Sequence, residues 1–143
     1  MNSSPQESVP LKSVIELIGV YRADGGAVGE TKYVISKLLG TAHCALCDIT
    51  NSPLRRRPAW DRMVASLGVP FVLLHLNQMP PDVAAAINTA RAPAVLARLA
   101  DGSLATALRP IDLEPLGGSV SEFSRALADA LNQNHWVLKR STT

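Results

Sequence analysis

Two cysteines, Cys44 and Cys47, stand three positions apart and are the only ones in this chain of 143 residues. His43 precedes the pair and Asp48 follows it, so one short stretch holds four groups that can bind a metal ion or transfer a proton. Two thiols at this spacing can close a small disulfide ring or supply two of the four ligands of a zinc ion. A third interpretation is that both are plain buried residues, since free cysteine packs as a small hydrophobe.

A metal site would need further ligands, and the candidates are His43, Asp48 and His75. His75 lies in the apolar run of residues 69–76, which favours a histidine held in the core or at a strand end over a ligand. A single Cys-x-x-Cys without a second pair is weak evidence for zinc. We therefore predict no resident metal ion and no other cofactor.

The composition is that of an ordinary globular domain, with 47% hydrophobic and 18% charged residues. It contains no run of about 18 apolar residues that could cross a bilayer, and the first ten residues lack the pattern of a secretory signal. We expect a cytoplasmic protein with no membrane partner. In that reducing compartment a close cysteine pair is typical of catalysis, redox sensing or metal binding rather than of a permanent cross-link.

Charge gives little reason to expect a nucleic-acid partner, because the net charge is +2 and aromatic residues make up only 4%. Arg55, Arg56 and Arg57 lie between two prolines, which predicts an exposed loop that could steer acidic partners toward the cysteines. Residues 24–32 join a strand to a helix as a phosphate-binding loop does, but they lack the residue order of a P-loop. We expect an ordinary turn there.

Hydrophobic periodicity predicts an α/β domain in which strands and helices alternate. Continuous or alternating apolar runs indicate strands at residues 14–21, 69–76, 94–99 and 104–108. Apolar residues at helical spacing indicate helices at residues 34–39, 60–67, 80–90 and 120–131. Asp101-Gly102 predicts a hairpin turn, and Ser119 predicts a helix cap. The expected domain spans residues 13–134, between tails at residues 1–12 and 135–143.

This order of elements resembles the thioredoxin fold: a βαβ start, a helix, an Xaa-Pro step into a β-hairpin, and a closing helix. Ala92-Pro93, followed by the two predicted hairpin strands, is similar to the segment of that family that carries a cis-proline. The resemblance implies a three-layer sandwich, with a mixed sheet and helices on both faces. It also implies that Pro93 is the cis residue beside the active site of a thiol-disulfide oxidoreductase acting on protein thiols.

By the same resemblance Cys44 is the attacking thiolate and Cys47 resolves the mixed disulfide. His43, directly before Cys44, would favour the thiolate. Asp48 would oppose the thiolate if it lay close to Cys44, or would serve as a proton acceptor for Cys47.

The chain departs from the family pattern in the position of the cysteines, because thioredoxins place them directly after the first strand, where this chain has residues 24–30. It also has Thr41 where a related group of bacterial thiol-disulfide oxidoreductases has an aspartate.

The local conformation of residues 44–50 decides between the two main interpretations. If these residues form an extended strand, the sulfurs point to opposite faces and cannot bridge, whereas in a turn or a first helical turn they can meet. The alternative function is a non-catalytic thioredoxin-like module that binds a protein partner, with structural or metal-ligating cysteines.

Overall fold

The computed structural model describes residues 10–22, 44–52 and 55–140. The helix predicted over residues 34–39 and the turn at residues 24–32 lie outside these ranges. The strands of the main sheet are β1 (Lys12–Val20), β4 (Phe71–Leu74), β5 (Ala94–Leu99), β6 (Leu104–Leu108) and β7 (Trp136–Leu138). The α-helices are α2 (Ala45–Thr50), α3 (Pro58–Leu67), α4 (Pro81–Ala90), α5 (Pro110–Leu113) and α6 (Val120–Gln133). The short elements are β2 (Asn51–Ser52), β3 (Arg55–Arg56) and the 3-10 helices η2 (Leu76–Gln78) and η3 (Glu114–Leu116).

Strand β1 is the centre of a five-stranded mixed sheet with the order β4-β1-β5-β6. It pairs in parallel with β4 on one edge and antiparallel with β5 on the other. Its first residues, Lys12 to Val14, pair in parallel with β7. At its other end Val20 pairs with both Leu74 and Ala94. The α/β class and the mixed sheet are therefore confirmed.

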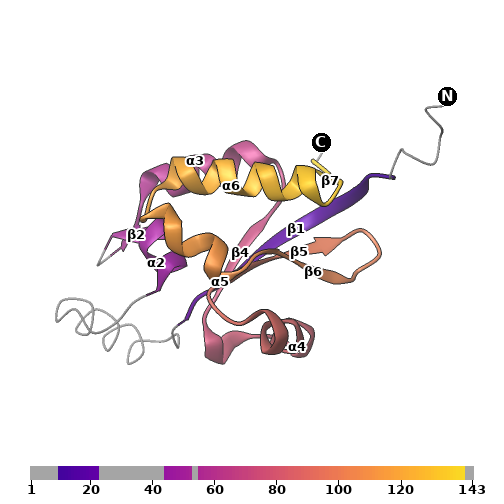
Figure 1. Cartoon of the computed structure of the whole chain (residues 1–143), viewed down its shortest axis with the longest axis horizontal. Coiled ribbons are helices and arrows are strands. Elements are labelled where there is room, and N and C mark those ends of the chain that lie inside the picture. Colours follow the sequence, from indigo (N-terminus) through magenta and orange to yellow (C-terminus); the bar gives the residue numbers. More distant parts are fainter. Residues whose placement is uncertain (1–9, 23–43, 53–54, 141–143) are drawn as a thin grey trace.

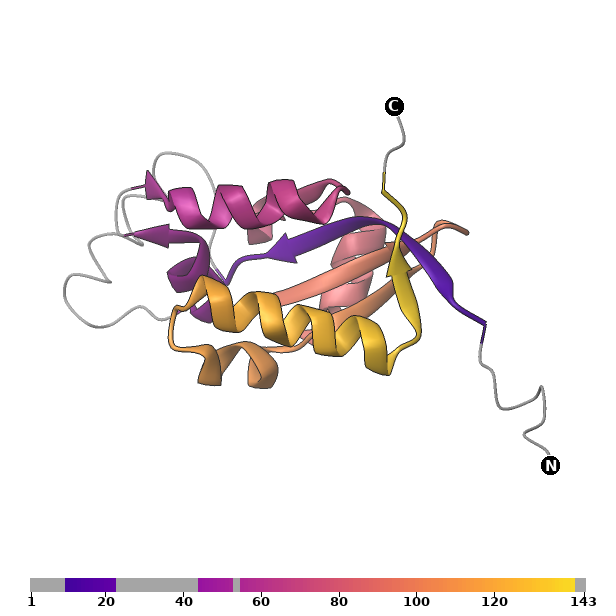
Figure 2. The ribbon, with the colours of Figure 1, turned by 90° about the horizontal axis from the view of Figure 1, so that it is seen from above.

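Helices cover both faces of this sheet (Figure 1). Helices α3 and α6 run along one face, and α4 lies on the other; the view from above shows α3 and α6 flanking β1 (Figure 2). The two faces bury separate apolar clusters, and alternate residues of β1 enter each: Leu17 packs with α3 and α6, whereas Ile18 packs with α4. This alternation is the consequence of the two-residue period of a strand.

Local sequence signals explain the two long helices on the first face. Pro58 occupies the first turn of α3, and Gly68 ends the helix with a φ of 77°. The Ser119 hydroxyl accepts a hydrogen bond of 3.1 Å from the Glu122 N–H and caps α6. Trp60 of α3 makes an edge-to-face contact with Phe123 of α6, with ring centroids 5.1 Å apart. The predicted hairpin of β5 and β6 also forms.

Strands extend into both segments predicted from the sequence to be tails. Residues Trp136–Leu138 form β7 rather than part of a tail, and β1 begins at Lys12 rather than after it. The Lys12 N–H also donates to the His135 carbonyl at 3.0 Å. The start of β1 and β7 pair with each other although they are near opposite ends of the chain. A strand of three residues is too short to show a hydrophobic period in the sequence. The strand predicted over residues 69–76 is likewise shorter and spans Phe71–Leu74.

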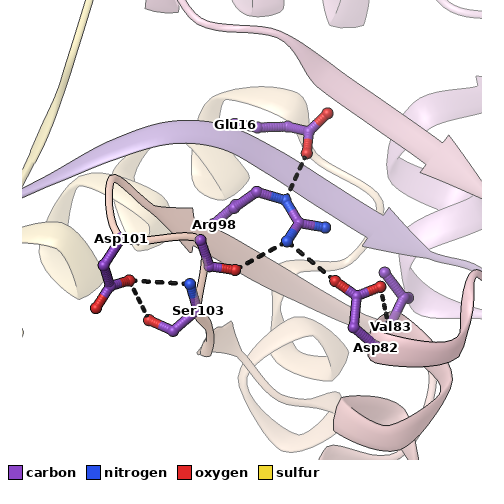
Figure 3. Close-up of polar contacts among 7 residues, drawn as sticks. Glu16, Asp82, Val83, Arg98, Asp101 and Ser103 are labelled. Atoms are coloured by element: carbon purple, nitrogen blue, oxygen red, sulfur yellow. Dashed lines mark hydrogen bonds and ion pairs between the residues drawn. The ribbon is translucent and has the colours of Figure 1, made fainter.

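One charged cluster fastens α4 to the sheet (Figure 3). The Arg98 guanidinium on β5 donates to Glu16 of β1 at 3.1 Å, to Asp82 of α4 at 3.0 Å and to the Gly102 carbonyl of the hairpin turn at 3.0 Å. The hydrogen bond from Arg98 lowers the pKa of the Asp82 carboxyl below its ordinary value of 3.8. A single side chain thus joins two neighbouring strands, a helix and a turn.

We expect this cluster to give stability a recognisable dependence on pH. Because the folded-state pKa of Asp82 is lowered, its contribution is present above pH 3.8 and is lost as the pH falls through the folded-state pKa. Asp82→Asn should therefore lower the free energy of unfolding near neutral pH, and the difference from the unaltered protein should vanish in acid. Urea unfolding at a series of pH values measures this. Asp129→Asn, on an exposed part of α6, is the control, and an equal pH profile for both variants would contradict the prediction.

Gly19 provides a second test, because this position leaves room for α2. A Cβ at residue 19 would lie 2.9 Å from Leu73 Cδ2 and 3.1 Å from Leu46 Cδ2, both closer than ordinary contact. Gly19→Ala should therefore destabilise the protein by about 1 to 3 kcal/mol through overpacking. In a Leu73→Ala background the same change should cost less, because the nearest atom is gone. Urea unfolding of the four proteins gives the coupling, and simple additivity of the two changes would contradict the proposed crowding.

Candidate functional site

Cys44 and Cys47 form a disulfide whose Cα atoms are 5.2 Å apart. Cys44 is the N-cap of α2, with the extended backbone angles φ −147° and ψ 106°, and Cys47 lies in the first turn of that helix. Residues 44–50 are therefore not a strand, and the conformation that lets the sulfurs meet is the one present. The side chain of Cys44 takes the place that a serine or aspartate usually has at a helix N-terminus.

Two backbone N–H groups point at the sulfur of Cys44. The N–H of Cys47 donates at 3.3 Å, within the turn of the helix, and the N–H of Arg22 donates at 3.4 Å from the end of β1. Arg22 and Cys44 are 22 positions apart in the sequence, yet they touch in the fold. The cysteine pair thus lies directly beside the carboxyl end of β1, and the two donors would stabilise a negative charge on this sulfur.

Both sulfur-bearing residues are buried, with Cys44 1% and Cys47 4% exposed. Leu46 and Ile49, also on α2, have no exposed surface and enter the core between α3, α6 and the sheet. The helix therefore anchors in the main core while carrying the disulfide. A partner thiol reaches a sulfur only after a local movement uncovers it.

A buried group of hydroxyls fastens the other end of α2 to β1. Tyr21 and Thr50, 5% and 0% exposed, have their hydroxyl oxygens 2.7 Å apart. The Asn51 side-chain amide donates to both, at 3.1 Å and 2.8 Å, and Thr50 donates to the Cys47 carbonyl at 3.4 Å. No local sequence pattern marks Tyr21 or Thr50 as site residues, because their contact spans 29 positions. The only local signal was a tyrosine at the end of an apolar strand.

His75 directly follows β4, as expected of a strand-end histidine, and its ring meets that of Tyr21 edge-on with centroids 4.9 Å apart. Its Nδ1 is 2.9 Å from Gln78 Oε1. Among the residues that the structure describes, no group of three or more histidine, cysteine and acidic side chains could hold a metal ion. The structure therefore does not bring His75 and the cysteines together as a set of ligands.

Asp48 lies on α2 next to Gly118. Gly118 comes shortly before helix α6 and has a φ of 76°. A Cβ at Gly118 would lie 3.5 Å from the Asp48 carbonyl oxygen. Arg57, the last residue of the predicted arginine loop, donates to the Gly118 carbonyl at 2.6 Å. One arginine of that run therefore binds the backbone near the cysteine helix. The role of Asp48 as a proton acceptor for Cys47 stays a prediction.

Pro93 follows a cis peptide bond, as the sequence resemblance implies. It is buried and precedes Ala94, the residue of β5 that pairs with Val20. Pro93 is thus at the same end of the sheet as Tyr21, Arg22 and the disulfide. His43, the remaining predicted site residue, lies outside the described residues.

No family model, curated protein or solved structure matched the chain when it was compared with them. Within the described part of the chain, no helix is long and apolar enough to cross a membrane. The geometry of the cysteine pair is therefore the feature that indicates a function.

The capping role of Cys44 can be separated from its role in the disulfide. Cys44→Ser and Cys44→Ala both remove the cross-link, but only serine keeps an oxygen that can accept from the Cys47 N–H. The alanine variant should be less stable than the serine variant by about 0.5 to 2 kcal/mol, the usual value of an N-cap. Urea unfolding followed by circular dichroism under reducing conditions measures the difference. Equal stability of the two variants would contradict a capping role for the side chain at position 44.

Proposed function

We propose that this protein is a thioredoxin-like thiol-disulfide oxidoreductase that uses Cys44 and Cys47 in reversible exchange. The observation that carries the proposal is the position of the pair: a disulfide across the first turn of α2, with the end of β1 donating a hydrogen bond to Cys44. In sequence the cysteines are far from β1, but in space they directly follow it. That is the place in which thioredoxins carry their cysteines.

The order of the elements supports the same proposal. A strand, a helix and a parallel strand are followed by a helix, a cis-proline, an antiparallel hairpin and a closing helix. These are β1, α3, β4, α4, Pro93, β5 with β6, and α6. Helices on both faces of the mixed sheet agree with a three-layer sandwich. Because many functions can share one fold, the activity itself is proposed from the cysteine site.

In the proposed reaction a partner thiolate attacks Cys44 Sγ and forms a mixed disulfide, while Cys47 leaves as a thiolate and takes up a proton. A second thiolate of the partner then attacks the partner sulfur bonded to Cys44. Cys44 leaves as a thiolate, stabilised by the N–H groups of Arg22 and Cys47. The protein disulfide gains two electrons and two protons, and two partner thiols become a disulfide. The reverse reaction reduces a partner in the cytoplasm expected from the sequence.

The burial of the cysteines favours a second candidate function. With exposed fractions of 1% and 4%, the disulfide could instead be a permanent cross-link in a non-catalytic module that binds a protein partner. The two functions differ in the reduction potential, because structural disulfides resist reduction by glutathione and typically lie below about −300 mV.

A redox titration distinguishes the two functions. The purified protein would be equilibrated in glutathione buffers of graded potential, its free thiols alkylated, and the intact chain weighed. We expect a reversible change between disulfide and dithiol at a potential between about −150 and −300 mV. Cys47→Ser, which leaves one thiol, is the control for alkylation without exchange. A wild-type disulfide that stays intact across this range while the protein is folded would reject the exchange function in favour of the structural one.

A further inference from the structure

We propose that Tyr21 and Thr50 are positioning residues that hold α2 in the conformation in which Cys44 and Cys47 can bond, and so help to set their redox equilibrium. This inference rests on the proposed function, since it concerns the same cysteine pair. The positioning role would explain why two hydroxyls, those of Tyr21 and Thr50, are buried where apolar side chains could fill the core.

The hydrogen bonds form a chain with a defined direction. Thr50 has one hydroxyl proton, and it is directed at the Cys47 carbonyl at 3.4 Å. With the Thr50 proton on that carbonyl, the Tyr21 hydroxyl is the donor in its 2.7 Å bond to Thr50, although the geometry of that bond alone would allow either direction. The Asn51 amide donates to the Tyr21 oxygen at 3.1 Å. Each buried hydroxyl thus both donates and accepts. Such chains strengthen their members, and removal of one leaves a buried group without its partner.

The chain ends on the backbone of a cysteine. The Cys47 carbonyl accepts from the Thr50 hydroxyl and also from the Asn51 N–H that closes α2. Thr50 is held by its main chain as well, since its carbonyl accepts from the Arg57 N–H at 2.8 Å. The end of α2 that follows Cys47 is therefore tied to Tyr21 through buried contacts.

Consecutive residues of the strand end hold the two ends of this helix. Tyr21 binds Thr50 at the last residue of α2 through its hydroxyl, and Arg22 binds the sulfur of Cys44 at the N-cap through its N–H. Helix α2 has six residues, so it is too short to be stable alone. Its conformation depends on these contacts and on the burial of Leu46 and Ile49.

The thermodynamic effect follows from what each redox state requires. The disulfide needs an ordered first turn, whereas the dithiol can also populate states in which that turn is loosened. A contact that exists only when α2 is ordered stabilises the disulfide and the ordered dithiol but not the loosened dithiol. Loss of the contact therefore shifts the equilibrium toward the dithiol.

The test is the reduction potential of Tyr21→Phe, which removes the hydroxyl and keeps the ring that contacts His75. From the net worth of one hydrogen bond we expect the equilibrium constant for disulfide formation to fall roughly threefold to tenfold. For two electrons this is a potential about 15 to 30 mV less negative. Thr50→Val should shift the potential in the same direction and serves as a second variant should the first fold poorly. Potentials are read in glutathione or, for a stronger disulfide, in dithiothreitol buffers.

Matched controls separate positioning from a general loss of stability. In Ser66→Ala the lost hydroxyl also donates to a carbonyl three residues earlier, that of Met63 at 2.6 Å, but on α3. This variant should leave the potential unchanged. Tyr21→Phe combined with Cys44→Ser and Cys47→Ser measures the cost of the lost hydroxyl when no disulfide can form.

The outcomes for this inference and for the proposed function are distinct. A wild-type potential outside the glutathione range rejects the exchange function, while a shift in Tyr21→Phe measured in dithiothreitol still supports the positioning role. An unchanged potential in both Tyr21→Phe and Thr50→Val, accompanied by equal destabilisation with and without the cysteines, would overturn the positioning role and leave the exchange function standing.

Discussion

The pairing of β1 on both of its edges is the constraint on which the rest of the structure depends. Val20 is bonded into β4 on one side and β5 on the other, so the backbone that follows it leaves the sheet from a fixed point. Tyr21 and Arg22 occupy that point, and each makes one contact with the cysteine helix. The same pairing places Pro93 opposite them, because Pro93 precedes the partner of Val20. The candidate site therefore consists of the end of β1 together with the cysteine helix and Pro93, which lie beside it.

The proposed exchange would place two conflicting demands on the cysteine pair, a fixed geometry and access to a sulfur. Helix α2 is anchored by Leu46 and Ile49 in the main core, which fixes the geometry of the sulfurs and withdraws them from solvent. Reactivity, in contrast, needs access to a sulfur. The contacts at the pair are compatible with both demands. The N–H donors to Cys44 and the hydroxyls linked to the Cys47 carbonyl order the disulfide without adding a charged group. The free energy needed to uncover the sulfur would then govern the rate of any exchange.

The sequence predicted best what is local. Ser119 and the Asp101-Gly102 turn mark a helix start and a hairpin within a few residues of the elements they belong to, and both have the predicted roles. The cis bond at Pro93 was predicted from the resemblance of its neighbours to a known segment. The contacts of the site were harder to predict from the sequence. Arg22 meets Cys44 and Tyr21 meets Thr50 only because the chain returns to the same strand end. Strand β7 was missed for the same reason, as it is defined by pairing with Lys12 to Val14 and not by a pattern of its own.

Gly19 carries a consequence for how this site could vary. Where β1 lacks a side chain at Gly19, the ends of the Leu46, Phe71 and Leu73 side chains fill the space, so a residue of the cysteine helix packs directly against the strand. The strand and the helix therefore share one volume. A larger residue at position 19 would be accommodated best together with smaller residues among positions 46, 71 and 73, so that β1, β4 and the cysteine helix would vary together.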